Sequence, residues 1–249
     1  MEENQFNFPT EEIELPSKGL LYPEDNPLSS GKIEMKYMTA KEEDILTNQN
    51  YIQKGIVLDK LLQSLIVSKI NYKDLIVGDK NALLIAARIL GYGKDYAFTY
   101  NGEEVSIDLS ELENKEIDES LFERGKNEFE FTLPSSNVNI TFQILTHGDE
   151  SKVDQEIRGL KKLNKSASPE LSTRLKHILL SVNGDYEKKT IRDFVDNYFL
   201  ARDTRAFRQH VKQFQPDITL TTAIETSDGG LEDIEIPINL NFFWPDVTI

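Results

Sequence analysis

One stretch of the chain reads Ala82-Leu83-Leu84-Ile85-Ala86-Ala87-Arg88-Ile89-Leu90 and is apolar on almost every side. A helix with this pattern is buried at the centre of a core, whereas a surface helix is apolar along one stripe. Asp79 precedes the stretch as a candidate cap, and Gly91 and Gly93 follow it as a left-handed helix end. We therefore expect the other elements to pack around this helix.

The residues before this stretch predict an extended segment followed by two helices. Four prolines lie between positions 9 and 27, and they exclude long helices from residues 1–38. The alternation of Ile33, Met35 and Tyr37 with charged residues is typical of a half-buried strand. Thr39 with Glu42 has capping-box spacing, which predicts a short helix to about residue 48. Residues 55–69 carry an apolar stripe at helical spacing.

The residues after Gly93 predict two β-hairpins, because the apolar period changes from helical spacing to alternation. Alternating runs flank Asn101-Gly102, the dipeptide that most strongly favours a two-residue hairpin turn. A second pair of runs, 129–133 and 138–142, is separated by a four-residue loop that begins with Pro134.

A second helical segment is expected over 150–214. Ser168-Pro169-Glu170 has the features of a helix start, and this helix should continue to Val182. Thr190 is expected to cap the next helix, with Phe194, Tyr198 and Phe199 facing inward. Strands then resume around Ile218–Thr222 and Ile234–Ile238. A helical block followed by a hairpin thus occurs twice, at 39–109 and at 150–240. The expected fold is α+β, with hairpins that the fold brings together.

We expect three parts: an extended segment at 1–38, helices with two hairpins at 39–149, and helices with a hairpin and an aromatic tail at 150–249. The last two should form one compact unit. No apolar run approaches the ~20 residues that span a bilayer, so no membrane association is expected. The absence of cysteine excludes disulfides, thiol nucleophiles and cysteine-ligated zinc.

The net charge of −15 is unevenly distributed along the chain. Residues 101–130 carry a net charge of −8 and residues 216–249 carry −7, whereas residues 151–215 carry +6. Such segments can steer association with partners or with copies of the same chain, although they are also compatible with ordinary solvated surface. The acidic total disfavours nucleic-acid binding, and 151–215 is the one segment that leaves it open.

The sequence contains no pattern that indicates catalysis or a cofactor. His147, His177 and His210 have no acidic or histidine partner at metal-ligand spacing on one helix face. Acidic pairs such as Glu42-Glu43, Glu103-Glu104 and Glu232-Asp233 are more typical of solvated surface than of acid–base chemistry. We therefore expect neither an enzyme nor a cofactor, and a hydrolase with scattered acids is a weak alternative.

Two segments are candidate partner contacts. Arg202, Arg205 and Arg208 form a basic stripe on a predicted helix. The stripe either meets phosphate or an acidic partner, or it pairs internally with Asp196, Asp203 and the acidic ends of the chain. The extended N-terminal segment is rich in apolar residues that would suit a partner's sheet or groove, namely Phe6, Phe8, Leu20, Leu21 and Tyr22.

The aromatic end at Phe242, Phe243 and Trp244 needs burial, since each ring can bury on the order of 150–250 Å². Either it anchors the last hairpin to the protein's own core or it docks on a partner. We favour the internal anchor.

Several stretches together resemble the baseplate hub assembly proteins of T-even-type contractile-tail phages. They include Ile13-Glu14-Leu15-Pro16-Ser17-Lys18-Gly19 and Phe242-Phe243-Trp244-Pro245-Asp246. The other stretches are 38–46, 77–81 with 86–88, 91–93, 105–109, 127–134 and 201–208. No single stretch is specific, but their order is, and they cover nearly the whole chain.

The resemblance implies a late phage protein that helps to build the central hub of the tail baseplate in the host cytoplasm. Its partners would be hub proteins, and it would act as a non-enzymatic, chaperone-like assembly factor that need not stay in the virion. Sister members are described as hub components, so a permanent structural subunit is the alternative.

The chain departs from the family pattern at two hairpins. Many relatives carry Cys-x-x-Cys pairs near positions 100–102 and 224–230, which together would make a four-cysteine zinc site. Here the turns remain and the cysteines are absent. We therefore expect a zinc-ribbon-like pair of hairpins that apolar burial holds together without metal.

Overall fold

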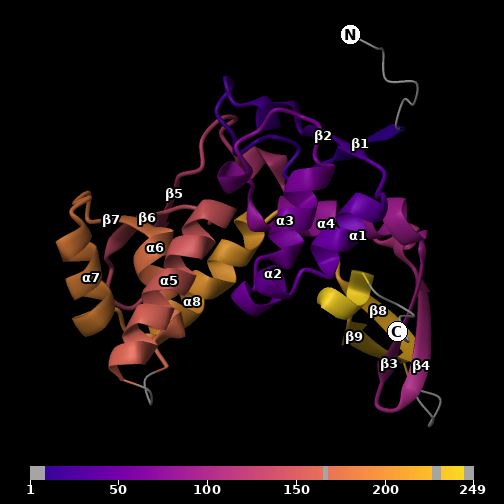
Figure 1. The fold of residues 1–249 in the computed structure, drawn as a ribbon. Helices are drawn as coiled ribbons and strands as arrows, with labels where there is room; N and C mark the ends of the chain where they lie inside the picture. The colour runs from indigo at the N-terminus through magenta and orange to yellow at the C-terminus, as the bar shows by residue number, and fades with distance from the viewer. Residues whose placement is uncertain (1–8, 165–167, 226–230, 244–249) are drawn as a thin grey trace.

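The computed structural model describes residues 9–164, 168–225 and 231–243, and it has an α+β fold (Figure 1). The chain begins with an antiparallel ribbon of β1 (Thr10–Glu14) and β2 (Lys32–Lys36), in which Ile13 lies opposite Ile33. Ile33 and Met35 are buried, so the half-buried strand predicted from their alternation is confirmed.

The first helical block comprises α1 (Ala40–Leu46), α2 (Gln49–Lys54), α3 (Val57–Leu65) and α4 (Val77–Tyr92). The capping box predicted before α1 is present. Helix α2 was not predicted from the sequence. Asn48 caps its start, and Gly55 ends it in a left-handed conformation with φ +68°. Both residues are strong local signals for helix ends.

Helix α4 lies at the centre of the core, as its composition predicted. Leu83 and Ala87 are completely buried. The first turn of α4 packs so closely on the segment after the second helical block that a Cβ on Gly78 would lie 1.8 Å from the Pro216 carbonyl oxygen. The predicted cap at Asp79 is wrong, because the helix begins at Val77.

Two hairpins follow α4, as predicted. Strands β3 (Asp95–Tyr100) and β4 (Glu103–Asp108) are joined by Asn101 and Gly102, whose φ angles of +50° and +87° fit a type I′ turn. Strands β5 (Phe129–Thr132) and β6 (Asn139–Phe142) form the second hairpin.

The second helical block contains α5 (His147–Leu163), α6 (Glu170–Ile178), α7 (Lys188–Asn197) and α8 (Ala201–Val211). The predicted continuation of helix to Val182 is wrong. The chain instead forms β7 (Leu179–Val182), which extends the β5–β6 sheet by pairing with β6. Thr190 is not a cap, since α7 begins two residues earlier at Lys188.

The last hairpin consists of β8 (Thr221–Glu225) and β9 (Leu231–Glu235), and its turn lies outside the described residues. The first strand begins later than predicted, because Ile218 forms an isolated bridge with Asn114 instead. The second strand begins earlier than predicted and ends at Glu235. Short 3-10 helices connect the elements at Pro27–Ser30, Tyr72–Asp74, Leu109–Glu111, Glu119–Leu121, Lys212–Phe214 and Leu240–Phe243.

The fold brings the β3–β4 and β8–β9 hairpins side by side, as the sequence predicted (Figure 1). The Tyr100 hydroxyl donates a 3.1 Å hydrogen bond to Glu232 Oε1. The Tyr96 hydroxyl lies 3.4 Å from the Pro237 carbonyl oxygen, to which it donates. Tyr96 is buried, so contact between the hairpins is apolar at its centre and polar at its edge.

Candidate partner-binding surface

The apolar N-terminal segment does not supply an exposed surface. Leu20, Leu21 and Tyr22 are buried in the core, so the expectation that they contact a partner is corrected for these three residues. Phe6 and Phe8 lie outside the described residues. The chain turns back on itself after β1, and the Leu20 carbonyl oxygen accepts a 2.8 Å hydrogen bond from the Gly125 N–H.

Asp79 explains why this segment is buried. Its carboxylate is fully buried and accepts hydrogen bonds from the Ser17 N–H (2.9 Å), the Ser17 hydroxyl (2.7 Å) and the Tyr22 hydroxyl (2.5 Å). The Tyr22 oxygen in turn accepts from the Ile76 N–H at the start of α4. Burial raises the pKa of Asp79 above its ordinary value, and these hydrogen bonds oppose that effect. The cluster fastens the N-terminal segment to α4 and has a structural role.

Helix α8 presents the basic stripe predicted from the sequence. Arg202, Arg205 and Arg208 are all exposed to solvent. Among the described residues, none of the three guanidinium groups has an ion pair or a hydrogen-bond partner. Three uncompensated cations along one helix are an electrostatic feature that an acidic partner can recognise.

The alternative that the stripe pairs internally with Asp196 and Asp203 is not what the structure shows. Asp196 lies 2.6 Å from Lys176 Nζ. Asp203 is fully buried and accepts from the N–H groups of Ser135 (2.7 Å) and Ser136 (3.0 Å) in the β5–β6 loop. Burial opposes ionisation of Asp203, but these hydrogen bonds prevail and hold its pKa below the ordinary value.

The opposite face of α8 is held rigidly by an aromatic cluster. Phe207 is buried and meets Phe142 edge to face, with ring centroids 5.2 Å apart. His210 stacks on Phe131 at 4.2 Å, and burial lowers its pKa. Since α8 is anchored by Phe207 and His210 and by the Asp203 contacts at its first turn, the arginines project from a fixed support.

Apolar side chains lie at the start of the same helix. Tyr198 is 63% exposed and Leu200 is 50% exposed. The prediction that Tyr198 points inward is wrong, because α7 ends at Asn197 and Tyr198 lies outside the helical repeat. The junction of α7 and α8 therefore combines exposed apolar area with unpaired positive charge. We call Tyr198, Leu200, Arg202, Arg205 and Arg208 the α8 surface.

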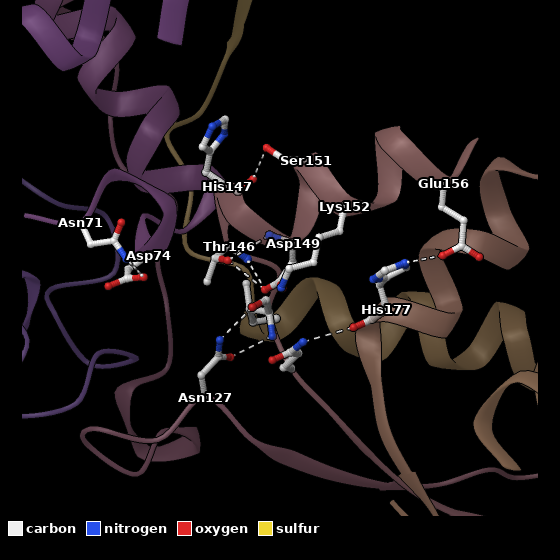
Figure 2. Close-up of polar contacts among 12 residues, drawn as sticks. Asn71, Asp74, Asn127, Thr146, His147, Asp149, Ser151, Lys152, Glu156 and His177 are labelled. Carbon is white, nitrogen blue, oxygen red and sulfur yellow. Dashed lines mark hydrogen bonds and ion pairs between the residues drawn. The ribbon is translucent and has the colours of Figure 1, made fainter. Parts of the chain in front are cut away.

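Two histidines have acidic partners from other elements, which the sequence alone did not reveal. His177 Nε2 on α6 lies 3.0 Å from Glu156 Oε2 on α5 (Figure 2). Arg192 binds the same carboxylate at 2.9 and 3.0 Å. These contacts tie α5, α6 and α7 together. Burial raises the pKa of Glu156 and the hydrogen bonds lower it, with a net result below its ordinary value.

His147 lines a polar cleft of about 700 Å³ between α2–α3 and α5. On its floor, Lys80 Nζ lies 2.5 Å from Asp59 Oδ1 and 3.4 Å from His147 Nδ1, while the Tyr72 hydroxyl donates to Asp59 at 3.0 Å. Burial and the nearby Lys80 charge lower the pKa of His147. These groups satisfy one another and join the two helical blocks, so we assign them a structural role.

Among the described residues, no group of three or more histidine, cysteine, aspartate or glutamate side chains is arranged to hold a metal ion. The expectation of solvated acidic pairs is wrong for Glu42, which is fully buried. Glu103, Glu104, Glu232 and Asp233 are exposed, as expected. No helix in the described part of the chain is long and apolar enough to cross a bilayer.

The aromatic end lies inside the protein as far as the structure describes it. Phe242 and Phe243 are completely buried, as an internal anchor requires, and Trp244 lies outside the described residues. Phe242 packs edge to face on Tyr96 of β3, with ring centroids 4.8 Å apart. The anchor thus reaches the β3–β4 hairpin.

Comparison of the chain with protein-family models, with curated proteins and with solved structures finds no match.

Proposed function

We propose that this chain is a non-enzymatic assembly factor for the central hub of a contractile-tail phage baseplate, and that it binds an acidic hub protein through the α8 surface. The family resemblance of its sequence motifs supports the hub as the target and the host cytoplasm as the place of action. The exposed, unpaired arginines of α8 are the observation that carries the choice of surface.

The charged and the apolar residues of the α8 surface contribute to binding in different ways. Arg202, Arg205 and Arg208 orient an acidic partner and raise the encounter rate, because long-range attraction acts before contact. Tyr198 and Leu200 supply affinity by burying apolar area, and tyrosine and arginine are the residue types most often found at interaction hot spots. A surface of this modest extent suits reversible binding, which an assembly factor needs in order to leave its partner.

A pull-down from a lysate of phage-infected cells tests this function, with the bound proteins identified by mass spectrometry. We expect the wild-type chain to capture baseplate hub proteins and the variant R202E/R205E/R208E to lose them. The control is K188E/K189E, which reverses two exposed lysines on α7. Equal capture by all three proteins would refute the α8 surface, and capture without any hub protein would refute the function.

A permanent hub subunit is the alternative, and the description of sister family members as hub components favours it. Quantitative mass spectrometry of purified virions separates the two. The chain at a fixed stoichiometry in finished particles would identify a subunit, whereas its depletion from particles and abundance in the lysate supports an assembly factor.

A further inference from the structure

A second exposed surface carries the charge opposite to that of the α8 surface. Leu231, the first residue of β9, is 76% exposed. Asp233 and Glu235 lie on the same face of the strand, because side chains alternate between its two faces, and both are exposed. Within the described residues, Asp233 and Glu235 have no ion pair. Glu232 lies on the other face and accepts from the Tyr100 hydroxyl. We call Leu231, Asp233 and Glu235 the β9 surface.

The two surfaces combine the same two features with opposite charge. Each places exposed apolar area beside charges that lack a counter-ion, namely Arg202 and Arg205 on one and Asp233 and Glu235 on the other. In the isolated chain, the apolar residues of each surface remain in water, and the like charges beside them have no counter-ion. Contact between the two surfaces would satisfy both at once.

The fold prevents one chain from making this contact with itself. Helices α7 and α8 lie at one side of the molecule and β8–β9 lies at the other, with α2 and α3 between them (Figure 1). The segment charges follow the same division, with +6 over 151–215 and −7 over 216–249. Two copies are therefore needed to bring the surfaces together.

We infer that this chain self-associates head to tail, with the β9 surface of one copy docked on the α8 surface of the next. Leu231 packs on Tyr198 and Leu200, while Asp233 and Glu235 meet Arg202 and Arg205. Because the contact is heterologous, each added copy leaves one surface of each kind free, so growth continues until a ring closes. Attraction of this kind weakens with added salt.

The inference rests on the proposed function in that both use the α8 surface, and a hub protein bound there would compete with the next copy. It requires no hub protein, however. The test therefore uses the purified full-length chain alone, so that its failure leaves hub binding untouched.

The experiment is analytical ultracentrifugation of two variants, singly and mixed. R202Q/R205Q neutralises the α8 surface and keeps the β9 surface, and D233N/E235Q does the reverse. We expect the wild type to form species larger than a dimer, in a manner that depends on concentration and is reduced by salt. Each variant alone should be monomeric, with a Kd for self-association raised about tenfold or more. The mixture should give a 1:1 heterodimer that grows no further, because only one complementary pair of surfaces remains.

Matched charge changes elsewhere provide the controls. K188Q/K189Q and E24Q/D25N alter exposed residues by the same amounts, and both should associate like the wild type. Three results would overturn the inference: a wild type that is monomeric at all concentrations, a variant that associates normally, or a mixture without heterodimer. Formation of the heterodimer also excludes misfolding as the cause of each variant's monomeric state.

Discussion

The Nε atom of Arg88 donates a 2.9 Å hydrogen bond to the backbone carbonyl oxygen of Phe242. The guanidinium also donates to the carbonyl oxygens of Gly93 (3.0 Å) and Asp95 (3.2 Å), and it lies near the rings of Tyr92 and Tyr96. Arg88 is 2% exposed, and the groups that compensate its charge are carbonyl dipoles and aromatic faces. One side chain of α4 thus joins the end of the central helix, the start of β3 and the aromatic end.

Phe242→Ala should lower the free energy of unfolding by about 3–5 kcal/mol, because it removes a fully buried ring and leaves a cavity against Tyr96. Urea denaturation followed by circular dichroism measures the change. Tyr198→Ala, which truncates an exposed ring, is the control and should change the stability by less than about 1 kcal/mol. A Phe242→Ala protein with wild-type stability would contradict the role of this end as an internal anchor.

Zinc content should be nil, and a chelator should leave the melting temperature unchanged. The chain has no cysteine, and the two hairpins are joined by Tyr96, Tyr100 and Phe242. Elemental analysis of the purified protein and thermal melts with and without chelator measure both quantities. A chelator-sensitive melting temperature would show that a metal supports this fold.

Glu42→Gln should destabilise the protein by roughly 3 kcal/mol at neutral pH. Burial of Glu42 raises its pKa, but hydrogen bonds from Lys36, Thr39 and Ser64 outweigh that effect and lower the pKa from 4.5 to about 2. A lowered pKa stabilises the folded state above pH 4.5, and this contribution is lost as the pH falls from 4.5 toward 2. Denaturation at a series of pH values should therefore show a shallower acid slope for Glu42→Gln than for the wild type.

Comparing the acid slope of Glu42→Gln with that of the wild type separates the effect of losing the charge from the effect of losing the side chain. Glu43→Gln changes an exposed neighbour in the same helix and should leave both the stability and the slope nearly unchanged. Identical slopes for the wild type and Glu42→Gln would contradict the assignment of the lowered pKa.

His210→Phe should reduce the loss of stability that occurs as the pH falls below 6.5. Burial lowers the pKa of His210 below 6.5, so the unfolded chain binds a proton more readily than the folded one in this range. Phenylalanine keeps the stacking on Phe131, and it removes the buried Nε2 atom, which lacks a partner. His147, whose pKa is also lowered, should leave a residual slope in the variant. A slope equal to that of the wild type would contradict the assignment.

Local signals in the sequence predicted the helical blocks and the hairpins. The Thr39 capping box, the Asn101-Gly102 turn and the apolar run of α4 act through neighbouring residues, and each of these is present in the structure. Strand β7 was missed because its residues follow a helix without a break in the apolar pattern. Its conformation depends on pairing with β6, about 40 residues earlier in the chain.

The candidate surface was predicted in part. The spacing of Arg202, Arg205 and Arg208 placed them on one helix, but spacing does not reveal whether a charge has a counter-ion. The structure leaves these arginines unpaired because Asp203 is turned inward to the β5–β6 loop. In the same way, the apolar content of the N-terminal segment suggested an exposed docking strand, and the buried Asp79 carboxylate instead draws Tyr22 inward.

The sequence by itself determined which segments form helices and hairpins, the absence of any thiol chemistry and the uneven distribution of charge. These properties follow from composition and from interactions between residues a few positions apart. Only the tertiary structure decided which apolar and charged groups reach solvent. Burial and ion pairing depend on contacts between residues far apart in the chain, such as the hydrogen bond between Arg88 and Phe242.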